Sequence, residues 1–344
     1  MTKRILAFLL AGALLFATTG CTGTAAGSSS AQSAQQQAGT QAAQEQGTIG
    51  LCIEQTDDLF WADYYSELQT LLQTKGYTLL VQQNEDGSAT QADQIKACAE
   101  QGAGAVIVNL TPSTDTAKVV TALKNANLPA VLVGQEPTRE LMESYDRMVY
   151  VGGSGVQAGT LQGELVLGTP TKGDLNGDGV ISYVMIQGDP EDVGTKLSTE
   201  YSIKALLDAG FKADQLAMQA AGWDADFAKQ ICAAALQQYG AQVEVVLCGN
   251  DTVAMGALQA IQDAGRTVGS DIYLVGTGAM SDALAKIQAG QMTGTVYHDP
   301  AQQAEKTAEL LKKGLKGNTF SKDEQKVYVD DTKIDADNVA QYLH

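Results

Sequence analysis

Asp174-Leu175-Asn176-Gly177-Asp178-Gly179-Val180-Ile181-Ser182-Tyr183 is the most informative stretch of the chain. Side chains that carry oxygen recur there at alternate positions, and the backbone carbonyl of Val180 can fill the one gap in the alternation. Gly179 stands where a tight ligand loop needs a sharp turn. These residues match, in order, the early ligand positions of the helix–loop–helix calcium site. They predict a calcium loop over residues 174–182, with a solvated Asp/Asn/Gly turn as the alternative.

The end of this loop departs from the pattern. The last ligand position, which is usually a bidentate Glu, falls on Met185. The residues after Ser182 form a short apolar run that ends in Gly188, which predicts a β-strand and not an outgoing helix. We therefore expect a calcium loop that leads into a strand, with the remaining carboxylate supplied from elsewhere in the fold.

Length and charge narrow the class of protein. The chain has 344 residues, which is enough for two domains with cores of their own. Its formal net charge is −18, from 40 acidic and 22 basic residues. A nucleic-acid-binding protein is expected to present a basic face, and the sequence shows none, so we predict no nucleic-acid partner.

The first residues look like a targeting segment. Lys3 and Arg4 precede an apolar run over 5–17, which is shorter than a membrane span. Small residues then lead to Cys21, as in a bacterial lipoprotein signal, so residues 1–21 are predicted to be a signal peptide with Cys21 lipidated. An ordinary secretory signal or an uncleaved anchor is the alternative. Residues 22–46 are rich in Ser, Ala and Gln and predict a flexible tether.

The other cysteines are Cys52, Cys98, Cys232 and Cys248. They lie inside apolar runs or helical patterns, and none of them has the spacing of a CxxC motif or a metal site. We expect small buried side chains, while disulfides stay possible.

From residue 48 onwards strands and helices alternate. A first series predicts strands over 48–53, 77–82, 105–110 and 130–133, with helices over 61–72, 92–99 and 117–123. A second series predicts strands over 149–151, 183–186, 216–219, 243–248, 272–275 and 293–297, with helices over 157–167, 196–209, 228–239, 252–264, 281–288 and 301–313. This repeated pattern predicts an α/β protein of two similar lobes, each a parallel sheet flanked by helices. A ligand would bind between the lobes, beyond the carboxyl ends of the strands.

Polar and aromatic residues gather at those predicted strand ends. Amides and carboxylates can form paired hydrogen bonds with adjacent hydroxyls, and aromatic rings can cover the C–H faces of a sugar, so these residues suit a polyhydroxyl ligand. Each has a structural alternative: Asp58 and Asp251 could be helix caps, and Phe60 could belong to the core. The candidates are Asp58, Phe60, Asn109, Trp223, Asn250, Asp251 and His298.

These residues, together with the loop, resemble a known family, the periplasmic-type sugar-binding proteins of ABC transport, and most closely the galactose/glucose (methyl-galactoside) binding branch. The resemblance runs from about residue 48 to the C-terminus. It rests on Asp57-Asp58-Leu59-Phe60, Val108-Asn109-Leu110, Gln135-Glu136-Pro137, Ser144-Tyr145-Asp146, the calcium loop, Trp223-Asp224, Glu244-Val245-Val246, Asn250-Asp251 and Gly294-Thr295-Val296.

The resemblance implies a type I periplasmic binding protein fold whose lobes are joined by a three-segment hinge near Val133, Tyr297 and Val329. The lobes would comprise residues 47–133 plus 298–329 and residues 134–297 plus 330–344. Sugar would favour the closed state, which would dock on an ABC permease of the membrane. We expect a monomer outside the cytoplasm, held to the cell membrane by the lipid on Cys21.

The resemblance also implies ligand sets. Glu244 would complete a structural Ca²⁺ shell with Asp174, Asn176, Asp178, the Val180 carbonyl and Ser182, where the family commonly has Gln at the last of these positions. Asp58, Phe60, Asn109, Trp223 and Asn250 match the positions that bind sugar, and Phe60 and Trp223 would sandwich the ring.

Other sugar-binding positions depart from the family pattern. Gly278 replaces an Asp, and His298 replaces an Asn. Asp192, Gly194 and Ser198 occupy the positions of a His-x-Asp…Arg cluster. Asp192 and His298 are therefore candidate contacts in a changed site, and a galactose- or glucose-like hexose is the first candidate ligand.

Three other functions compete with transport. A repressor of related fold would need a basic helix-turn-helix where the signal peptide and tether lie. A sensor that presents sugar to a chemoreceptor or histidine kinase would use the same lobe faces and stays open. An enzyme is disfavoured, because the chain has only two His and lacks both a nucleophile elbow and a phosphate-binding loop.

Overall fold

The computed structural model describes residues 47–54, 59–84 and 90–343. The predicted signal peptide with Cys21, the tether and Asp58 lie outside these residues. Within them, no helix has both the length and the apolar character that crossing a membrane requires.

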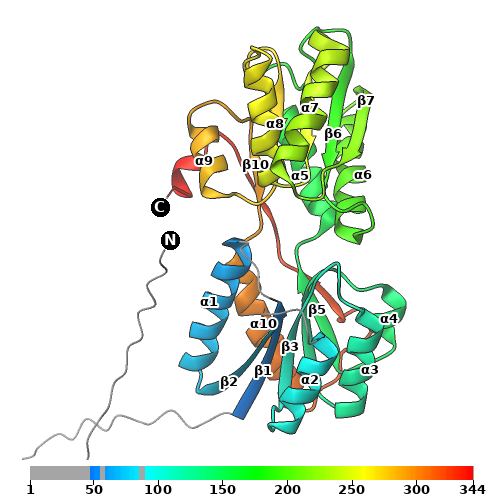
Figure 1. Ribbon diagram of the computed structural model, residues 1–344, viewed down its shortest axis with the longest axis vertical. Coiled ribbons are helices and arrows are strands. Elements are labelled where there is room, and N and C mark those ends of the chain that lie inside the picture. Colours follow the sequence, from blue (N-terminus) through cyan, green and yellow to red (C-terminus); the bar gives the residue numbers. More distant parts are fainter. Residues whose placement is uncertain (1–46, 55–58, 85–89, 344) are drawn as a thin grey trace, which may run out of the picture. The chain divides into compact units, whose positions relative to one another are not determined.

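The first lobe is built on a six-stranded sheet with the order β11-β5-β4-β3-β1-β2, in which every pairing is parallel. Helices cover both faces: α1 and α10 lie on one, and α2 and α3 on the other (Figure 1). The strands are β1 (Gly47–Glu54), β2 (Tyr77–Asn84), β3 (Ala105–Leu110), β4 (Ala130–Gly134), β5 (Met148–Gly152) and β11 (Lys326–Tyr328). The helices are α1 (Leu59–Thr74), α2 (Gln91–Glu100), α3 (Thr116–Ala126), α4 (Arg139–Glu143) and α10 (Pro300–Leu315).

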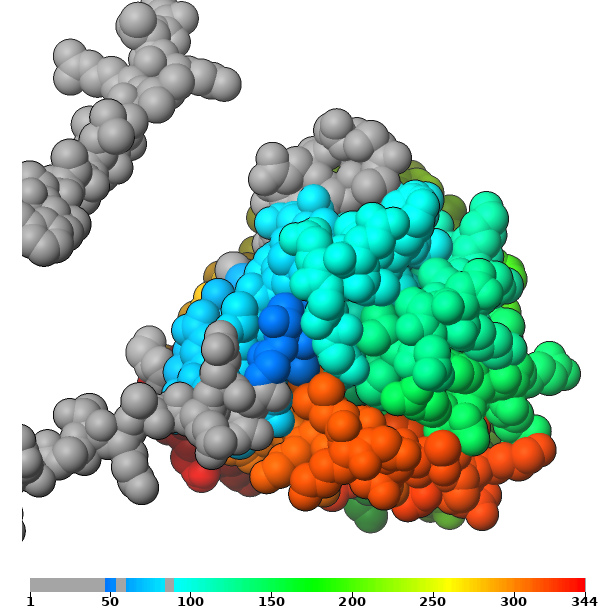
Figure 2. Space-filling view, turned by 90° about the horizontal axis from the view of Figure 1, so that it is seen from below, coloured from blue at the N-terminus to red at the C-terminus, as the bar shows by residue number. Residues whose placement is uncertain are grey.

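Alternation along the strands divides the core of this lobe into two layers. Leu51 belongs to the layer under α1 and α10, whereas its neighbour Cys52 belongs to the layer under α2 and α3. Every residue of β3 is buried, as expected of a parallel strand covered on both faces. Figure 2 views the first lobe from below, where the dark-blue start of β1 reaches the surface between cyan and orange segments. There Gly104 donates to the Thr48 carbonyl at 2.9 Å.

The second lobe contains a parallel sheet with the order β7-β6-β8-β9. Helices α5 and α6 pack on one face, and α7 and α8 on the other (Figure 1). The antiparallel pair β10–β12 adjoins it through a bridge between Val275 and Gly294. The strands are β6 (Val180–Gln187), β7 (Lys212–Ala220), β8 (Val245–Cys248), β9 (Tyr273–Val275), β10 (Thr295–Tyr297) and β12 (Thr332–Ile334). The helices are α5 (Gly155–Leu167), α6 (Val193–Asp208), α7 (Ala225–Tyr239), α8 (Asp251–Asp263) and α9 (Ser281–Gln288), with short 3₁₀ turns η1 (Gly240–Gln242) and η2 (Val339–Gln341).

The chain passes between the lobes after Gly152, after Tyr297 and after Tyr328. The predicted crossing near Val133 is therefore wrong, as is the domain boundary between 133 and 134. Strand β5 pairs with β4 and β11 in the first sheet, so residues 134–152 belong to the first lobe. Hydrophobic patterns locate a strand, but they do not say which of two similar sheets it joins. The four cysteines of the described chain, Cys52, Cys98, Cys232 and Cys248, are buried and free, as expected.

Candidate ligand site and calcium loop

The predicted ligand contacts in the described chain follow the carboxyl ends of strands. Phe60 comes after β1, and Asn109 lies at the end of β3 in the first lobe. In the second lobe, residues follow β6, β7, β8 and β10: Asp192, Trp223, Asn250 and His298. This is where open parallel sheets bind their ligands.

Trp223 is held at the surface by a platform of glycines. Its backbone has φ +67°, after Gly222 at +61°, and the side chain is 39% exposed although it is the bulkiest type of side chain. A Cβ on Gly188 would lie 1.9 to 2.3 Å from three atoms of the indole ring, so the ring rests directly on the backbone after β6. A Cβ on Gly249, after β8, would lie 3.4 Å from the same ring. Residues at the ends of three adjacent strands thus present one exposed aromatic face.

Asn109 carries an unsatisfied donor in the first lobe. The residue is 3% exposed, and its Nδ2 has no hydrogen-bond partner in the described part of the chain. A Cβ on Gly134, at the end of β4, would lie 2.9 Å from that nitrogen. A buried amide without a partner costs about 1–3 kcal/mol, so this nitrogen is suited to a ligand acceptor.

Asn250 and Asp192 both act as helix N-caps. Asn250 Oδ1 accepts from the Val253 N–H at 2.9 Å, and Asp192 Oδ2 accepts from the Thr195 N–H at 2.7 Å. Capping fixes their orientation at the starts of α8 and α6 and uses one oxygen of each side chain. Their remaining polar atoms can still serve a ligand.

Phe60 lies at the start of α1 in an aromatic cluster. Its ring is 5.1 Å from that of Trp61 in an edge arrangement and 6.4 Å from the Tyr64 ring. It packs against the core of the first lobe and is half-buried, so the core alternative is partly realised.

His298 has a partner that the sequence did not suggest. Its Nδ1 lies 2.6 Å from Asp331 Oδ1. Burial lowers the pKa of His298, but the hydrogen bond and charge of Asp331, together with the charge of Asp251, outweigh that effect and raise it above the ordinary 6.5. No local motif could reveal this pair, because the residues are far apart in the sequence.

The predicted calcium loop wraps around the carboxylate of Glu244. This side chain is 1% exposed, and its Oε1 accepts from the Leu175 and Asn176 N–H groups at 2.8 and 3.1 Å. Its Oε2 accepts from the Ser182 N–H at 2.9 Å. Gly177 and Gly179 have positive φ, and the loop runs into β6 at Val180, so the expected sharp turn and following strand are confirmed.

The side-chain oxygens of the loop are of the types that bind Ca²⁺, although in this structure they accept hydrogen bonds from backbone N–H groups. Asp174, Asn176 and Asp178 each accept from backbone N–H groups of the loop at 2.7 to 3.1 Å. In the described residues, no three carboxylate, imidazole or thiol groups converge as a metal cluster. Amide and carbonyl oxygens, which that observation leaves aside, are also calcium ligands. Glu244 is thus a buried carboxylate that accepts three backbone N–H groups of the loop, and a bound cation would have to compete with these donors for its oxygens.

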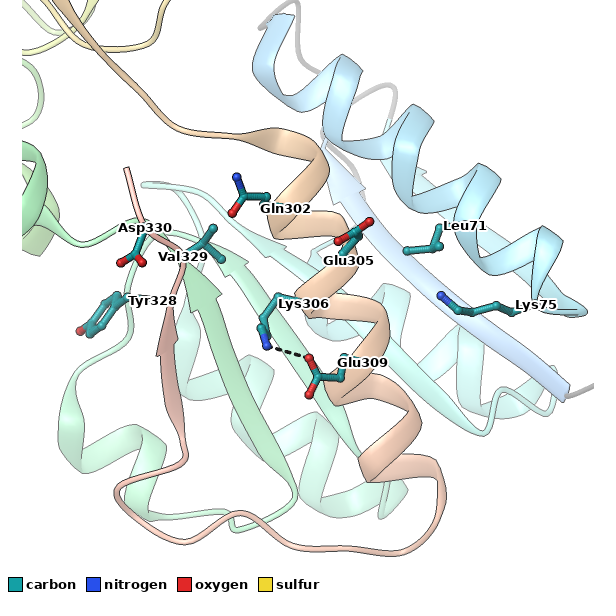
Figure 3. A pocket seen from close by; sticks show the side chains of 9 residues that line it. All are labelled: Leu71, Lys75, Gln302, Glu305, Lys306, Glu309, Tyr328, Val329 and Asp330. Carbon is teal, nitrogen blue, oxygen red and sulfur yellow. Dashed lines mark hydrogen bonds and ion pairs between the residues drawn. The ribbon is translucent and has the colours of Figure 1, made fainter. Parts of the chain in front are cut away.

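A separate cavity of about 470 Å³ lies beside α1, α10 and the end of β11 (Figure 3). Its walls mix both charges, and Lys306 pairs with Glu309 at 2.6 Å inside it. None of the predicted ligand contacts that the structure describes lines this cavity. The strand ends therefore remain the candidate ligand site.

A family model described as periplasmic binding protein domain matches residues 49–319. The chain belongs to the periplasmic binding protein family. The type I fold expected from the sequence is thereby confirmed, as is the resemblance to the periplasmic sugar-binding proteins of ABC transport.

Several curated members of this family are similar to the chain. The D-galactose/methyl-galactoside binding periplasmic protein MglB of Haemophilus influenzae is 28% identical, over 86% of this chain and 91% of that protein. The ribose import binding protein RbsB of Escherichia coli is 24% identical, over 78% and 85%. Both are named as binding proteins, so the prediction that the chain is not an enzyme is confirmed at the level of the family.

Solved structures share the fold. A solute-binding protein from Actinobacillus succinogenes with bound D-allose has a TM-score of 0.71 at 18% identity, over 86% of this chain and 100% of that chain. One from Bacillus halodurans with bound myo-inositol has a TM-score of 0.71 at 19% identity, over 88% and 99%.

Proposed function

We propose that this periplasmic binding protein binds a monosaccharide between its two lobes, with a galactose- or glucose-like hexose as the first candidate. The observation that carries the proposal is the indole of Trp223, exposed on Gly188 and Gly249 at the carboxyl ends of the second sheet. A rigid ring in this place provides an apolar face for the C–H side of a sugar.

Polar groups at the ends of the other strands support the same ligand class. Asn109 offers a buried NH₂ group that has no partner among the described residues. Asn250 and Asp192 cap helices, and His298 pairs with Asp331, but each keeps a polar atom for a ligand. Asp58 and Phe60 would complete the site from the first lobe. The names of similar proteins mention galactose, ribose, allose and myo-inositol, which are all rings rich in hydroxyls.

We further propose that the loop over 174–182 holds a structural Ca²⁺. Asp174, Asn176, Asp178, the Val180 carbonyl, Ser182 and Glu244 would hold the ion. A bound cation would offset the charge of the loop and stabilise the folded state by linkage. The contacts of buried Glu244 with both ends of the loop support this role.

For delivery, ligand would favour closure of the lobes about the three chain crossings, and the closed form would dock on an ABC permease. Lipidation of Cys21 and the tether over 22–46 would keep the protein near that permease. Replacing Cys21 with Ser should release the protein from membranes into the soluble fraction.

Calorimetric titration tests the proposed ligand. Purified protein is titrated with D-galactose, D-glucose, D-ribose and myo-inositol, before and after chelation of Ca²⁺. We expect at least one to bind with micromolar or lower Kd. Binding of none of them would reject the proposed ligand class.

A further inference from the structure

We propose that Asp331 is a positioning residue that holds His298 in the ligand site and makes ligand affinity depend on pH. The inference rests on the proposed function and adds a residue and a regulation to that site. Neither follows from the sequence, because His298 and Asp331 lie on separate passages of the chain between the lobes.

All three passages between the lobes meet at this pair. His298 follows β10 on the passage into α10, and Asp331 lies on the passage from β11 to β12. Gly153, on the passage from β5 to α5, is so close that a Cβ there would lie 2.9 Å from His298 Nδ1 and 3.3 Å from Asp331 Oδ1. A change in the bond between His298 and Asp331 therefore acts where lobe closure must bend the chain.

Asp331 is a buried carboxylate whose side chain is paired with His298. Its side chain is 2% exposed, and its Oδ2 has no hydrogen-bond partner in the described part of the chain. The Asp331 backbone N–H donates to Gln157 Oε1 at 3.0 Å, which fixes the segment against α5. A carboxylate so placed binds an imidazolium more strongly than a neutral imidazole, because the positive ring compensates its desolvated charge.

The charged groups around the ring are acidic. Asp331 lies against it, Asp299 follows it in the chain, Asp330 precedes Asp331, and Asp251 at the start of α8 acts through its charge. Asp299 caps α10 by accepting from the Ala301 and Gln302 N–H groups at 2.9 and 3.1 Å. This setting favours the protonated ring, which agrees with the raised pKa of His298.

The direction of the pH effect follows from linkage. A histidine pKa that is higher in the folded state contributes stability below its unfolded value of about 6.5, and that contribution is lost as pH rises through the folded pKa. If a ligand hydroxyl accepts from Nε2–H of the protonated ring, ligand binding raises this pKa further. By reciprocity, affinity then falls as pH rises.

Nuclear magnetic resonance can follow the ring directly, because the chain has only two His, His298 and His344. We expect the His298 resonance, identified by its loss in His298→Asn, to titrate above pH 6.5. Asp331→Asn should move that midpoint to lower pH. The matched control is Asp330→Asn, because Asp330 is exposed and lines the cavity of Figure 3, and it should shift the midpoint far less.

The affinity measurement uses the tightest binder among D-galactose, D-glucose, D-ribose and myo-inositol. We expect wild-type affinity to fall by about tenfold between pH 6 and pH 8.5, which corresponds to about one pKa unit of coupling. His298→Asn should bind more weakly than wild type at pH 6, because it lacks the Nε2–H donor, and it should lose most of that dependence. Burial raises the pKa of Asp251 to about 6, so this carboxyl could also contribute a pH dependence. Asp251 is still present in His298→Asn, so any contribution from it would remain in that variant.

Each result decides one question. The positioning role is overturned if the His298 midpoint of the wild-type protein lies at or below pH 6.5, or if Asp331→Asn leaves that midpoint unchanged. The wild-type titration needs no ligand and does not depend on whether the Asp331 variant folds. An equal pH dependence of affinity in wild type and His298→Asn overturns the pH control. Failure of all four ligands to bind rejects the proposed function and leaves the resonance measurement to judge the pair.

Discussion

Glu244 Oε2 accepts a hydrogen bond from the backbone N–H of Ser182 at 2.9 Å, which ties the residue before β8 to the third residue of β6. The other oxygen of Glu244 binds the start of the same loop. One buried carboxylate therefore spans the loop that we propose to bind Ca²⁺.

Replacing Glu244 with Gln should remove the calcium response. We expect Ca²⁺ to raise the unfolding midpoint of chelated wild-type protein by several degrees and to leave Glu244→Gln unchanged. Without Ca²⁺ the variant should lose about 1–3 kcal/mol, because Gln has one acceptor oxygen where the carboxylate has two. Differential scanning calorimetry measures both effects. Exposed Glu67→Gln is the control and should keep the full response; a wild-type midpoint that ignores Ca²⁺ would contradict the proposed site.

Trp223→Ala should weaken sugar binding by tenfold or more, because the exposed ring would lose its contact with the sugar. Phe227→Ala is a matched control, since Phe227 is 41% exposed and Trp223 is 39% exposed. The control should change affinity by less than about twofold, because Phe227 is not among the predicted ligand contacts. Equal losses in calorimetric titrations of the two variants would show that Trp223 has no special role.

Gly188→Ala should displace the Trp223 ring while leaving the Trp223 residue itself unchanged. The new Cβ would overlap the indole ring, so the ring must leave its platform. We expect a shifted tryptophan fluorescence spectrum and a loss of affinity comparable to that of Trp223→Ala. The control Gly168→Ala places its Cβ no closer than 3.3 Å to any neighbour. An unchanged affinity in Gly188→Ala would argue against the platform as the sugar-binding surface.

Asn109→Leu separates binding from stability. Nδ2 of Asn109 has no partner within the described ranges of the chain, so an apolar side chain of similar shape should leave the unfolding midpoint unchanged or raise it slightly. Sugar affinity should fall by about tenfold, since one buried donor to the ligand is lost. Thermal unfolding and titration of the same preparation give both values. A destabilised variant with normal affinity would assign Asn109 to the core.

The sequence predicted the positions of individual helices and strands better than it predicted which strands pair in the same sheet. The alternation of apolar runs and helical patterns placed β3 at its observed bounds, and the Asp/Asn spacing located the turn at Gly179. Patterns of this kind depend on neighbouring residues. The sheet that β5 joins depends on its pairing with β4 and with β11, the latter from the far end of the chain. Local patterns do not report either pairing, so the crossing near Val133 was misplaced.

The same limit applies to the site. Trp223 could be predicted from an aromatic residue in a polar loop, but its platform of Gly188 and Gly249 required the fold. Glu244 entered through family resemblance, because no local signal connects it to a loop so far away. Asp331 was missed for the same reason, and only the meeting of two passages brings it to His298.

The most direct test of the central claim is a calorimetric titration of wild-type protein and Trp223→Ala with D-galactose, D-glucose, D-ribose and myo-inositol at pH 6. We predict that at least one of these ligands binds wild-type protein with micromolar or lower Kd and binds Trp223→Ala at least tenfold more weakly. Absence of heat for every ligand, or equal affinity in the two proteins, would contradict a sugar site built on Trp223.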